Sequence, residues 1–182
     1  MKPALYPLEG ERIILEPFVE RFISDEYISW LTDEETIRWL VKAGSRIDRV
    51  EVEKFCRSMI VSADDCFFAI VLRQKEKHIG NVRIGTVDWT SRTTRFGMMI
   101  GDASARGCGF GTDVMALVED FAFGTLGLQT MRFPVVEDHR AAMRMYEKRH
   151  FAVDGYWSED FVRDGTAHRM VAMTKFNPKF AA

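Results

Sequence analysis

The chain has 182 residues, 47% of them hydrophobic, which is enough for one domain, residues 1–182, with a sizeable core. A formal net charge of −2 gives no general attraction to nucleic acid or to an anionic membrane, so we expect neither as a partner. Three cysteines without metal-ligand spacing, no membrane-length apolar run and no signal-peptide pattern together favour a cytoplasmic protein with no metal site.

The first half of the chain combines one strand pattern with short amphipathic stretches. Alternating apolar residues ended by a proline predict a strand, and apolar residues three or four apart predict helices. In chain order we expect a strand at 12–17 and helices at 24–31, 33–40 and 48–62. Gly44 should end the second helix, and Val52, Phe55 and Met59 of the third should face the core.

The second half begins with a strand meander and then alternates helix and strand. Strands are expected at 66–72, 79–87, 95–100, 131–136, 151–156 and 168–176. The last two of these should close around a turn at 163–165. One helix should follow residue 111 and stop at Gly124, and another should begin after Asp138 or His139. Strands first, then helix and strand in alternation, predict a mixed α/β sheet.

The most informative stretch holds three alternating glycines, Gly107, Gly109 and Gly111, preceded by Arg106. A helical pattern begins where the run ends. Such a turn leaves backbone N–H groups unpaired at a helix N-terminus, where the helix dipole also favours an anion. Glycine adopts backbone angles that other residues avoid and lets a bulky diphosphate approach the main chain. Arg106 would add a positive charge at the edge of this phosphate site.

Alternating glycines alone are weak evidence, because they also occur in structural turns before core helices. The run is not a P-loop, since it lacks Gly-Lys-Ser/Thr, and it does not have the G-x-G-x-x-G spacing of dinucleotide-binding folds. A second motif is therefore needed to choose between a structural turn and a phosphate site.

That second motif is present. Arg106-x-x-Gly109-x-Gly111 resembles the acetyl-CoA pyrophosphate motif of the GCN5-related N-acetyltransferases, the GNAT superfamily. The stretch 139–151 resembles the family's Asn-x-x-Ala-x-x-x-Tyr-Glu-Lys-x-Gly-Phe. The resemblance extends from about residue 10 to about residue 176 and is greatest to the branch of ribosomal-protein alanine acetyltransferases. It implies an α/β GNAT fold with a mixed, mostly antiparallel sheet of about seven strands flanked by helices.

The resemblance also implies acetyl-CoA as cosubstrate. The strand 97–100 should splay from the strand 132–136, so that freed backbone groups bind the pantetheine and one N–H polarises the thioester carbonyl. The cofactor-binding residues implied in this way are Met99, Ile100, Arg106, Gly107, Cys108, Gly109, Phe110, Gly111, Thr112, His139 and Tyr146.

Two residues are assigned to proton transfer by the resemblance and by position. Tyr146 matches the family's general acid, which protonates the departing thiolate, although a mid-helix tyrosine in an arbitrary protein is usually a core residue. The glutamate that many relatives carry two residues before the strand glycine is replaced by Arg95. Glu137, which follows the cleft strand, is our first candidate for the base. The alternatives are Asp88, Asp102 and Asp138, or a base acting through water.

Two positions depart from the family pattern. His139 replaces the usual asparagine, and His150 replaces the usual glycine, which suggests an ordinary backbone angle there in place of a left-handed one. Trp30 lies in a Trp-Leu-x-Asp-x-Glu stretch that in this branch helps to form the acceptor pocket.

The function expected from these residues is direct transfer of an acetyl group to a primary amine. The acceptor remains open among a protein N-terminus, an amino sugar nucleotide and a small amine, and a homodimer is possible by analogy. The alternatives are a CoA-binding module without catalysis and a purely structural domain. An acidic pocket would suit a polyamine, and a basic pocket would suit a nucleotide sugar.

Overall fold

The computed structural model describes residues 4–40, 48–163 and 165–180. Its first half contains β1 (Leu8–Glu9), β2 (Ile13–Pro17), η1 (Glu20–Phe22), α1 (Asp25–Trp30), α2 (Glu34–Ile37), α3 (Arg49–Val61) and β3 (Cys66–Leu72). The middle contains β4 (Lys77–Asp88), β5 (Thr93–Ile100), η2 (Ala103–Ala105), α4 (Phe110–Glu119) and the π-helical continuation η3 (Asp120–Thr125). The last part contains β6 (Thr130–Val136), α5 (Arg140–Lys148), β7 (Ala152–Tyr156), β8 (Phe161–Arg163), β9 (Thr166–His168), β10 (Met170–Phe176) and η4 (Pro178–Phe180).

One eight-stranded sheet organises the described chain, in the order β1-β2-β3-β4-β5-β6-β10-β7. Its neighbours pair antiparallel except β5 and β6, which are parallel. The α/β class and the mostly antiparallel mixed sheet are therefore confirmed. The eighth strand, which we did not expect, is β1. It has only two residues, too few to produce an alternating pattern in the sequence.

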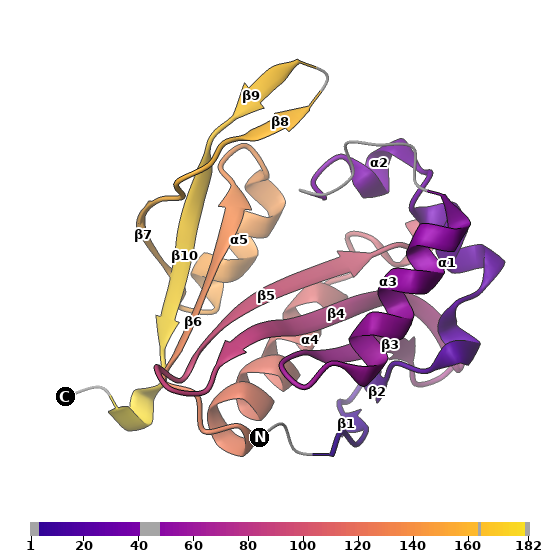
Figure 1. The fold of residues 1–182 in the computed structure, drawn as a ribbon, viewed down its shortest axis with the longest axis horizontal. Coiled ribbons are helices and arrows are strands. Elements are labelled where there is room, and N and C mark those ends of the chain that lie inside the picture. Colours follow the sequence, from indigo (N-terminus) through magenta and orange to yellow (C-terminus); the bar gives the residue numbers. More distant parts are fainter. Residues whose placement is uncertain (1–3, 41–47, 164, 181–182) are drawn as a thin grey trace.

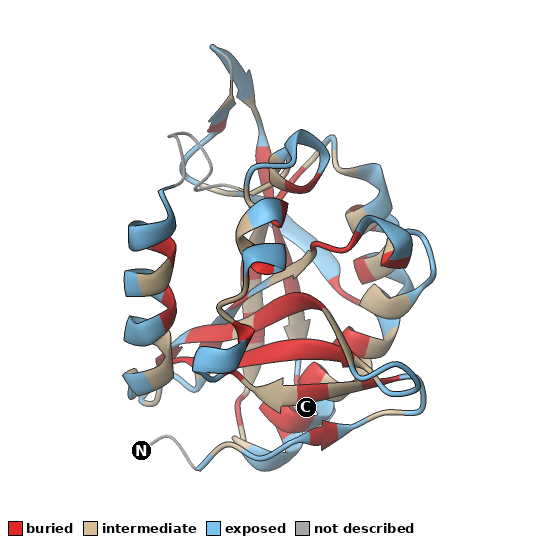
Figure 2. Cartoon of the chain, turned by 90° about the vertical axis from the view of Figure 1, so that its right-hand side faces the viewer, coloured by how far each residue is buried: buried red, intermediate tan, exposed pale blue. Residues whose placement is uncertain are grey.

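Helices cover both faces of the sheet, as Figure 1 shows. The helices α4 and α5 lie on one face, and α1 and α3 lie on the other face over the β2–β5 half. The larger hydrophobic cluster joins α4 and α5 to the sheet, and a second cluster joins α1 and α3 to it. Figure 2 shows the result as buried central strands and helices that are exposed on their outer sides. Within the described ranges no helix is both long and apolar enough to cross a membrane.

The two parallel strands β5 and β6 separate soon after they begin. Their register contains only Thr93 opposite Thr130 and Thr94 opposite Met131. Beyond these pairs β5 continues along β4, and β6 continues along β10, so the sheet opens into a fork between them (Figure 1). The splay expected from the family resemblance is thus present in the structure.

A buried ion cluster connects the elements behind the fork. Glu119 at the end of α4 is only 5% exposed. It accepts hydrogen bonds from Arg149 at 2.9 Å, just after α5, and from Lys175 of β10 at 2.6 Å. Because a buried carboxylate without these partners would be costly, the cluster fixes α4, α5 and β10 relative to one another.

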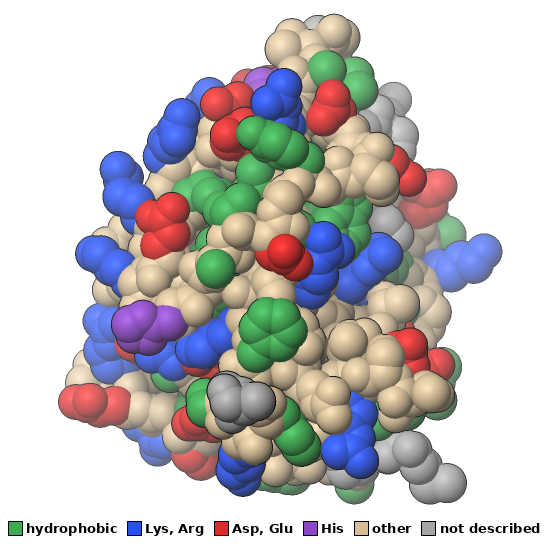
Figure 3. Space-filling model, turned by 90° about the vertical axis from the view of Figure 1, so that its left-hand side faces the viewer, with side chains coloured by type: hydrophobic (Ala, Val, Ile, Leu, Met, Phe, Trp, Pro, Cys, Tyr) green, Lys and Arg blue, Asp and Glu red, His purple; other side chains and the backbone are tan. Residues whose placement is uncertain are grey.

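One of the two edge strands of the sheet is β7, all five residues of which are exposed. Figure 3 looks onto this side of the molecule, where exposed hydrophobic side chains lie among charged ones. Tyr156 is 61% exposed and Phe176 of the neighbouring β10 is 66% exposed. The homodimer stays a prediction.

Two sequence-based expectations are wrong in detail. In α3 the buried residues are Val52 and Cys56, one helical turn apart, whereas Phe55 is 39% exposed and reaches only the edge of Phe67. The turn at 163–165 does not join the last two sheet strands directly. It closes the separate β8–β9 hairpin, which lies between them in the chain. The predicted stop at Gly44 lies outside the described residues.

His150 also differs from expectation. Its φ is +63°, so it keeps the left-handed conformation of the glycine that it replaces. The ordinary backbone angle that we expected there is therefore wrong. Left-handed backbone costs an L-residue about 1–2 kcal/mol, although histidine tolerates it better than most residues.

We expect His150→Gly to stabilise the protein by about 0.5–1 kcal/mol. The substitution removes backbone strain in the folded state, and the greater freedom of the unfolded chain offsets part of the gain. Denaturant unfolding with a fixed m-value measures the difference. His150→Ala, which keeps the strain, serves as the control, and a glycine variant no more stable than wild type would contradict the assignment.

Candidate active site

The glycine loop lies at the start of α4, where the sequence predicts an anion site. The helix begins at Phe110, and its N-cap is Gly109 with φ +82°. The N–H of Thr112 donates to the Gly109 carbonyl at 3.0 Å, but the N–H groups of residues 108 to 111 donate to no described residue. These orphan donors at a helix N-terminus form a site that suits a phosphate.

The loop also leaves room for a bulky diphosphate. A side chain added at Gly107 would meet nothing within 4 Å, and one at Gly109 would approach only the Arg12 guanidinium, at 3.4 Å. Both glycines have positive φ, so larger residues there would be strained. The backbone therefore fits the diphosphate of CoA on conformation and on space.

Arg106 does not place its charge at this loop, contrary to our expectation. Its guanidinium donates to Glu35 at 3.0 Å, to Asp33 at 2.7 Å and to the Gly101 carbonyl at 2.9 Å. It also donates to the Thr36 hydroxyl. The side chain thus holds α2 against the β5–α4 connection, and only its backbone remains part of the loop.

Arg12, which the sequence analysis did not single out, takes the position expected for Arg106. It precedes β2, and its Nη1 donates to the Cys108 carbonyl at 3.1 Å. Its Nε donates to Asp113 at 2.7 Å, and its guanidinium carbon lies 4.8 Å from the centre of the Phe110 ring. One side chain therefore contacts three residues of the loop and of the first turn of α4. Its partners lie about a hundred residues away in the sequence, so no local pattern could have revealed the role of Arg12.

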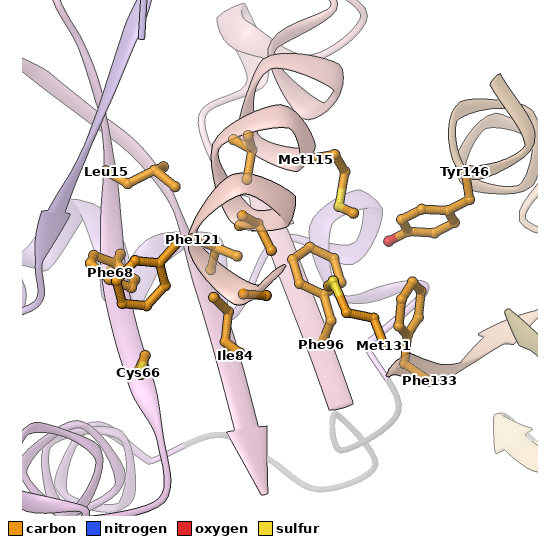
Figure 4. Close-up of a cluster of buried hydrophobic side chains, with 14 of the residues drawn as sticks. Leu15, Cys66, Phe68, Ile84, Phe96, Met115, Phe121, Met131, Phe133 and Tyr146 are labelled. Atoms are coloured by element: carbon orange, nitrogen blue, oxygen red, sulfur yellow. The ribbon is translucent and has the colours of Figure 1, made fainter. Parts of the chain in front are cut away.

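Tyr146 lies on the α4 and α5 side of the fork. It is 7% exposed, and its ring lies 5.0 Å from that of Phe133 on β6 and 6.3 Å from that of Phe96 on β5. Figure 4 shows its hydroxyl pointing away from α5 toward Met115 of α4. The hydroxyl makes no hydrogen bond to a described residue, and burial raises the pKa of the phenol. It is therefore held protonated, as a general acid requires.

Flexible methionines lie beside the last glycine of the loop. A side chain added at Gly111 would come within 3.0 Å of the Met145 sulfur and 3.3 Å of the end of Met98. Because methionine has three rotatable bonds, these side chains can move aside for a pantetheine arm. One cavity of about 350 Å³ lies beside β1, and another of about 260 Å³ lies between α1 and the β5–α4 connection, where Gly101 and Arg106 line it.

His139 occupies the N-cap position of α5, as one of our two alternatives predicted, but its side chain makes no capping hydrogen bond. Its ring stacks on Trp39 with a centroid distance of 4.7 Å. Burial, with the nearby charge of Arg38, lowers the pKa of His139. The ring is therefore neutral near pH 7, and its cofactor contact stays a prediction.

Trp30 and Glu137 occupy different positions relative to the fork. Trp30 is 6% exposed, packs against Gly101 and His78, and lines the smaller cavity beside α1. Glu137 directly follows β6, and its N–H donates to the Arg169 carbonyl at 2.9 Å. Their roles in acceptor binding and in proton removal stay predictions. Met99 and Ile100 pair with β4 but lie beyond the pairing with β6, so their main chain borders the fork.

Comparison with known proteins identifies the family. The sequence model of the acetyltransferase (GNAT) domain family matches residues 12–152 of this chain. This chain belongs to the GNAT acetyltransferase family. It is accordingly an acetyl-CoA-dependent N-acetyltransferase, which is the activity that the glycine loop, the fork and Tyr146 suit.

Individual relatives are distant. Human alpha/beta-tubulin-N-acetyltransferase 9 is 24% identical over 155 residues, which are 79% of this chain and 74% of that protein. A spermidine N-acetyltransferase from Vibrio cholerae, solved with CoA and spermine, has a TM-score of 0.83 at 18% identity, covering 92% of this chain and 97% of its own. A GCN5-related N-acetyltransferase from Brucella melitensis has a TM-score of 0.81 at 19% identity, covering 99% and 82%. These structures share the fold with this GNAT enzyme.

We expect Gly109→Ala to weaken CoA binding by about tenfold, because the left-handed angle costs an L-residue about 1–2 kcal/mol. Calorimetry with CoA measures the change. The matched control is Gly155→Ala on the β7 edge, where φ is +91° and an added side chain also meets nothing within 4 Å. The control should lose comparable stability without losing affinity. Equal affinity in both variants would contradict the loop assignment.

Arg12→Ala should raise the KM for acetyl-CoA by about five- to tenfold with little change in kcat, because it loosens the loop without touching the reacting atoms. Arg12→Lys should give an intermediate KM, since lysine keeps the charge but lacks the planar set of N–H donors of arginine. Arg21→Ala is the control. Arg21 also combines an ion pair with an aromatic contact, to Glu16 and Phe22, but away from the loop. A KM equal to that of the control would refute the positioning role.

Proposed function

We propose that the enzyme transfers the acetyl group directly from acetyl-CoA to a primary amine bound at the fork. The observation that carries this proposal is the position of Tyr146. Its buried hydroxyl, without a partner among the described residues, points toward α4, the helix that begins at the glycine loop, and both belong to the same hydrophobic cluster. A diphosphate on the loop would direct the pantetheine between α4 and α5 toward that hydroxyl.

In the proposed reaction the amine lone pair forms a C–N bond to the thioester carbon, and the carbonyl electrons move onto its oxygen. A backbone N–H on the part of β5 beyond its pairing with β6 donates to this oxyanion, which is charge stabilisation that needs no reorganisation. The C–S bond then breaks, and the thiolate takes the proton of Tyr146. The amine loses its proton to Glu137 through water, and Tyr146 regains a proton from solvent.

The acceptor class follows less directly from the relatives. The human relative is named for tubulin, and the Vibrio cholerae enzyme is named for spermidine, so similar chains accept both protein and polyamine amines. The likeness of the 106–111 and 139–151 motifs to ribosomal-protein alanine acetyltransferases adds a protein N-terminus to these classes. What these acceptors share is a primary amine, and this is the acceptor that we propose.

Tyr146→Phe should lower kcat by about 10²–10⁴-fold while leaving the KM for acetyl-CoA nearly unchanged, because only proton delivery to the thiolate is lost. Tyr27→Phe is the matched control, since Tyr27 is also buried, at 4% exposure, but lies in the other hydrophobic cluster. Steady-state rates on an active amine give both values. Unchanged kcat in the Tyr146 variant would contradict the acid role.

The raised pKa of Tyr146 adds a pH signature. A phenol with a pKa above its ordinary value of about 10 stays protonated throughout the neutral range. At pH values under about 10, deprotonation of Tyr146 should therefore cause no decrease in kcat. A decline in kcat near neutral pH that disappears in Tyr146→Phe would contradict the assignment.

A further inference from the structure

Two arginines lie where the fork opens. Thr94 opposite Met131 is the last pair in the β5–β6 register, so Arg95 and Arg132 are the first residues of the two strands beyond the pairing. Both guanidinium groups lie near the ring of Trp157, so two positive charges are held close together. Like charges held in this way repel each other, and a bound anion would reduce the repulsion.

A tryptophan fixes the position of both side chains. The guanidinium carbon of Arg95 lies 5.1 Å from the centre of the Trp157 ring, and that of Arg132 lies 5.2 Å from it. The backbone N–H of Trp157 donates to the Met170 carbonyl at 2.8 Å, and its side chain packs against the small hydrophobic cluster of Val136, Phe161 and Met170. Guanidinium groups held over an indole keep their N–H donors available at the edge.

The surrounding carboxylates do not cancel the positive charge of the arginine cluster, which consists of Arg95 and Arg132 beside Trp157. Arg132 pairs with Asp154 at 3.3 Å, but both side chains are largely exposed, so the pair is weak and exchangeable. Arg95 has no carboxylate partner among the described residues. Figure 3 shows the neighbouring face, on which Lys and Arg side chains lie beside hydrophobic ones with acidic groups dispersed among them.

The cluster lies on the opposite side of the sheet from Tyr146 and at the same level. Phe96 and Phe133, which contact Tyr146, directly follow Arg95 and Arg132, and successive strand residues point to opposite faces. In the proposed reaction the cofactor approaches from the face of α4 and α5, so the acceptor would reach the fork from this other face. Gly97, two residues beyond Arg95, leaves space there, because an added side chain would meet nothing within 4 Å.

Building on the proposed function, we infer that the acceptor is an amine that carries a phosphate or carboxylate close to its amino group, and that Arg95 and Arg132 bind this anion. A diamine would instead place a second positive charge against two arginines. The inferred specificity is thus for anionic amines and against polyamines.

The test is a series of amines of similar length: aminoethyl phosphate, β-alanine, ethanolamine and diaminopropane. We expect kcat/KM for the better anionic amine to exceed that for ethanolamine by about tenfold or more, with diaminopropane the poorest. The ranking of aminoethyl phosphate against β-alanine separates phosphate from carboxylate recognition. Added salt should reduce the preference.

Arg95→Gln and Arg132→Gln should each reduce the anionic preference about tenfold and leave the KM for acetyl-CoA unchanged, whereas Arg95→Lys should retain part of it. Arg57→Gln on the outer side of α3, which removes one exposed, ion-paired arginine, should change nothing. Equal rates on ethanolamine and the anionic amines, a preference for diaminopropane, or an anionic preference that survives both Gln variants would overturn the inference.

A binding measurement separates this inference from the proposed function. Calorimetry with the CoA-loaded enzyme measures affinity for N-acetylated aminoethyl phosphate and N-acetylated β-alanine without requiring turnover. Arg95-dependent binding of either compound supports the anion site even if no amine is acetylated, which would defeat only the proposed reaction. Absence of such binding, or binding equal in Arg95→Gln, overturns the anion site.

Discussion

The structure depends on one broken pairing, the parting of β5 from β6 after the Thr94–Met131 pair. A continuous sheet would satisfy every backbone group between these strands, so the fork leaves donors and acceptors that some other partner must satisfy. A pantetheine arm carries amide groups of the kind that these edges can bind. The two recognisable motifs lie at positions that follow from this opening. The glycine loop follows β5, and the tyrosine helix follows β6.

The elements on the two sides of the fork need a fixed separation, and a cluster of charged side chains provides it. Glu119, Arg149 and Lys175 form a largely buried cluster that ties α4, the end of α5 and β10 together. Removing one partner would leave a buried charge uncompensated, at a cost of about 3–5 kcal/mol. In front, Arg163 of the β8–β9 hairpin donates to the Ile37 carbonyl of α2, so the hairpin and α2 meet across the wide end of the fork (Figure 1).

Features that depend on neighbouring residues in the chain could be predicted from the sequence, whereas features that depend on long-range side-chain contacts could not. A helix at the glycine run and the helix carrying Tyr146 follow from neighbours within a few residues, although α4 begins at Phe110, inside the run, and not after Gly111 as expected. The exchange of roles between Arg106 and Arg12 does not, because each arginine is committed by partners 70 or more residues away. His150 shows a third case, in which the fold imposes a left-handed angle on a residue that does not prefer it.

The same fork explains why Arg95 can stand where relatives carry a carboxylate base. A guanidinium cannot accept the amine proton, because it stays charged at all relevant pH values. A fixed cation lowers the pKa of a nearby ammonium ion only while its own charge is uncompensated, and the anion inferred to bind Arg95 and Arg132 compensates that charge. In the proposed reaction the amine proton is therefore left to Glu137 acting through water. The two arginines would determine which amine binds, and they would not replace the missing base.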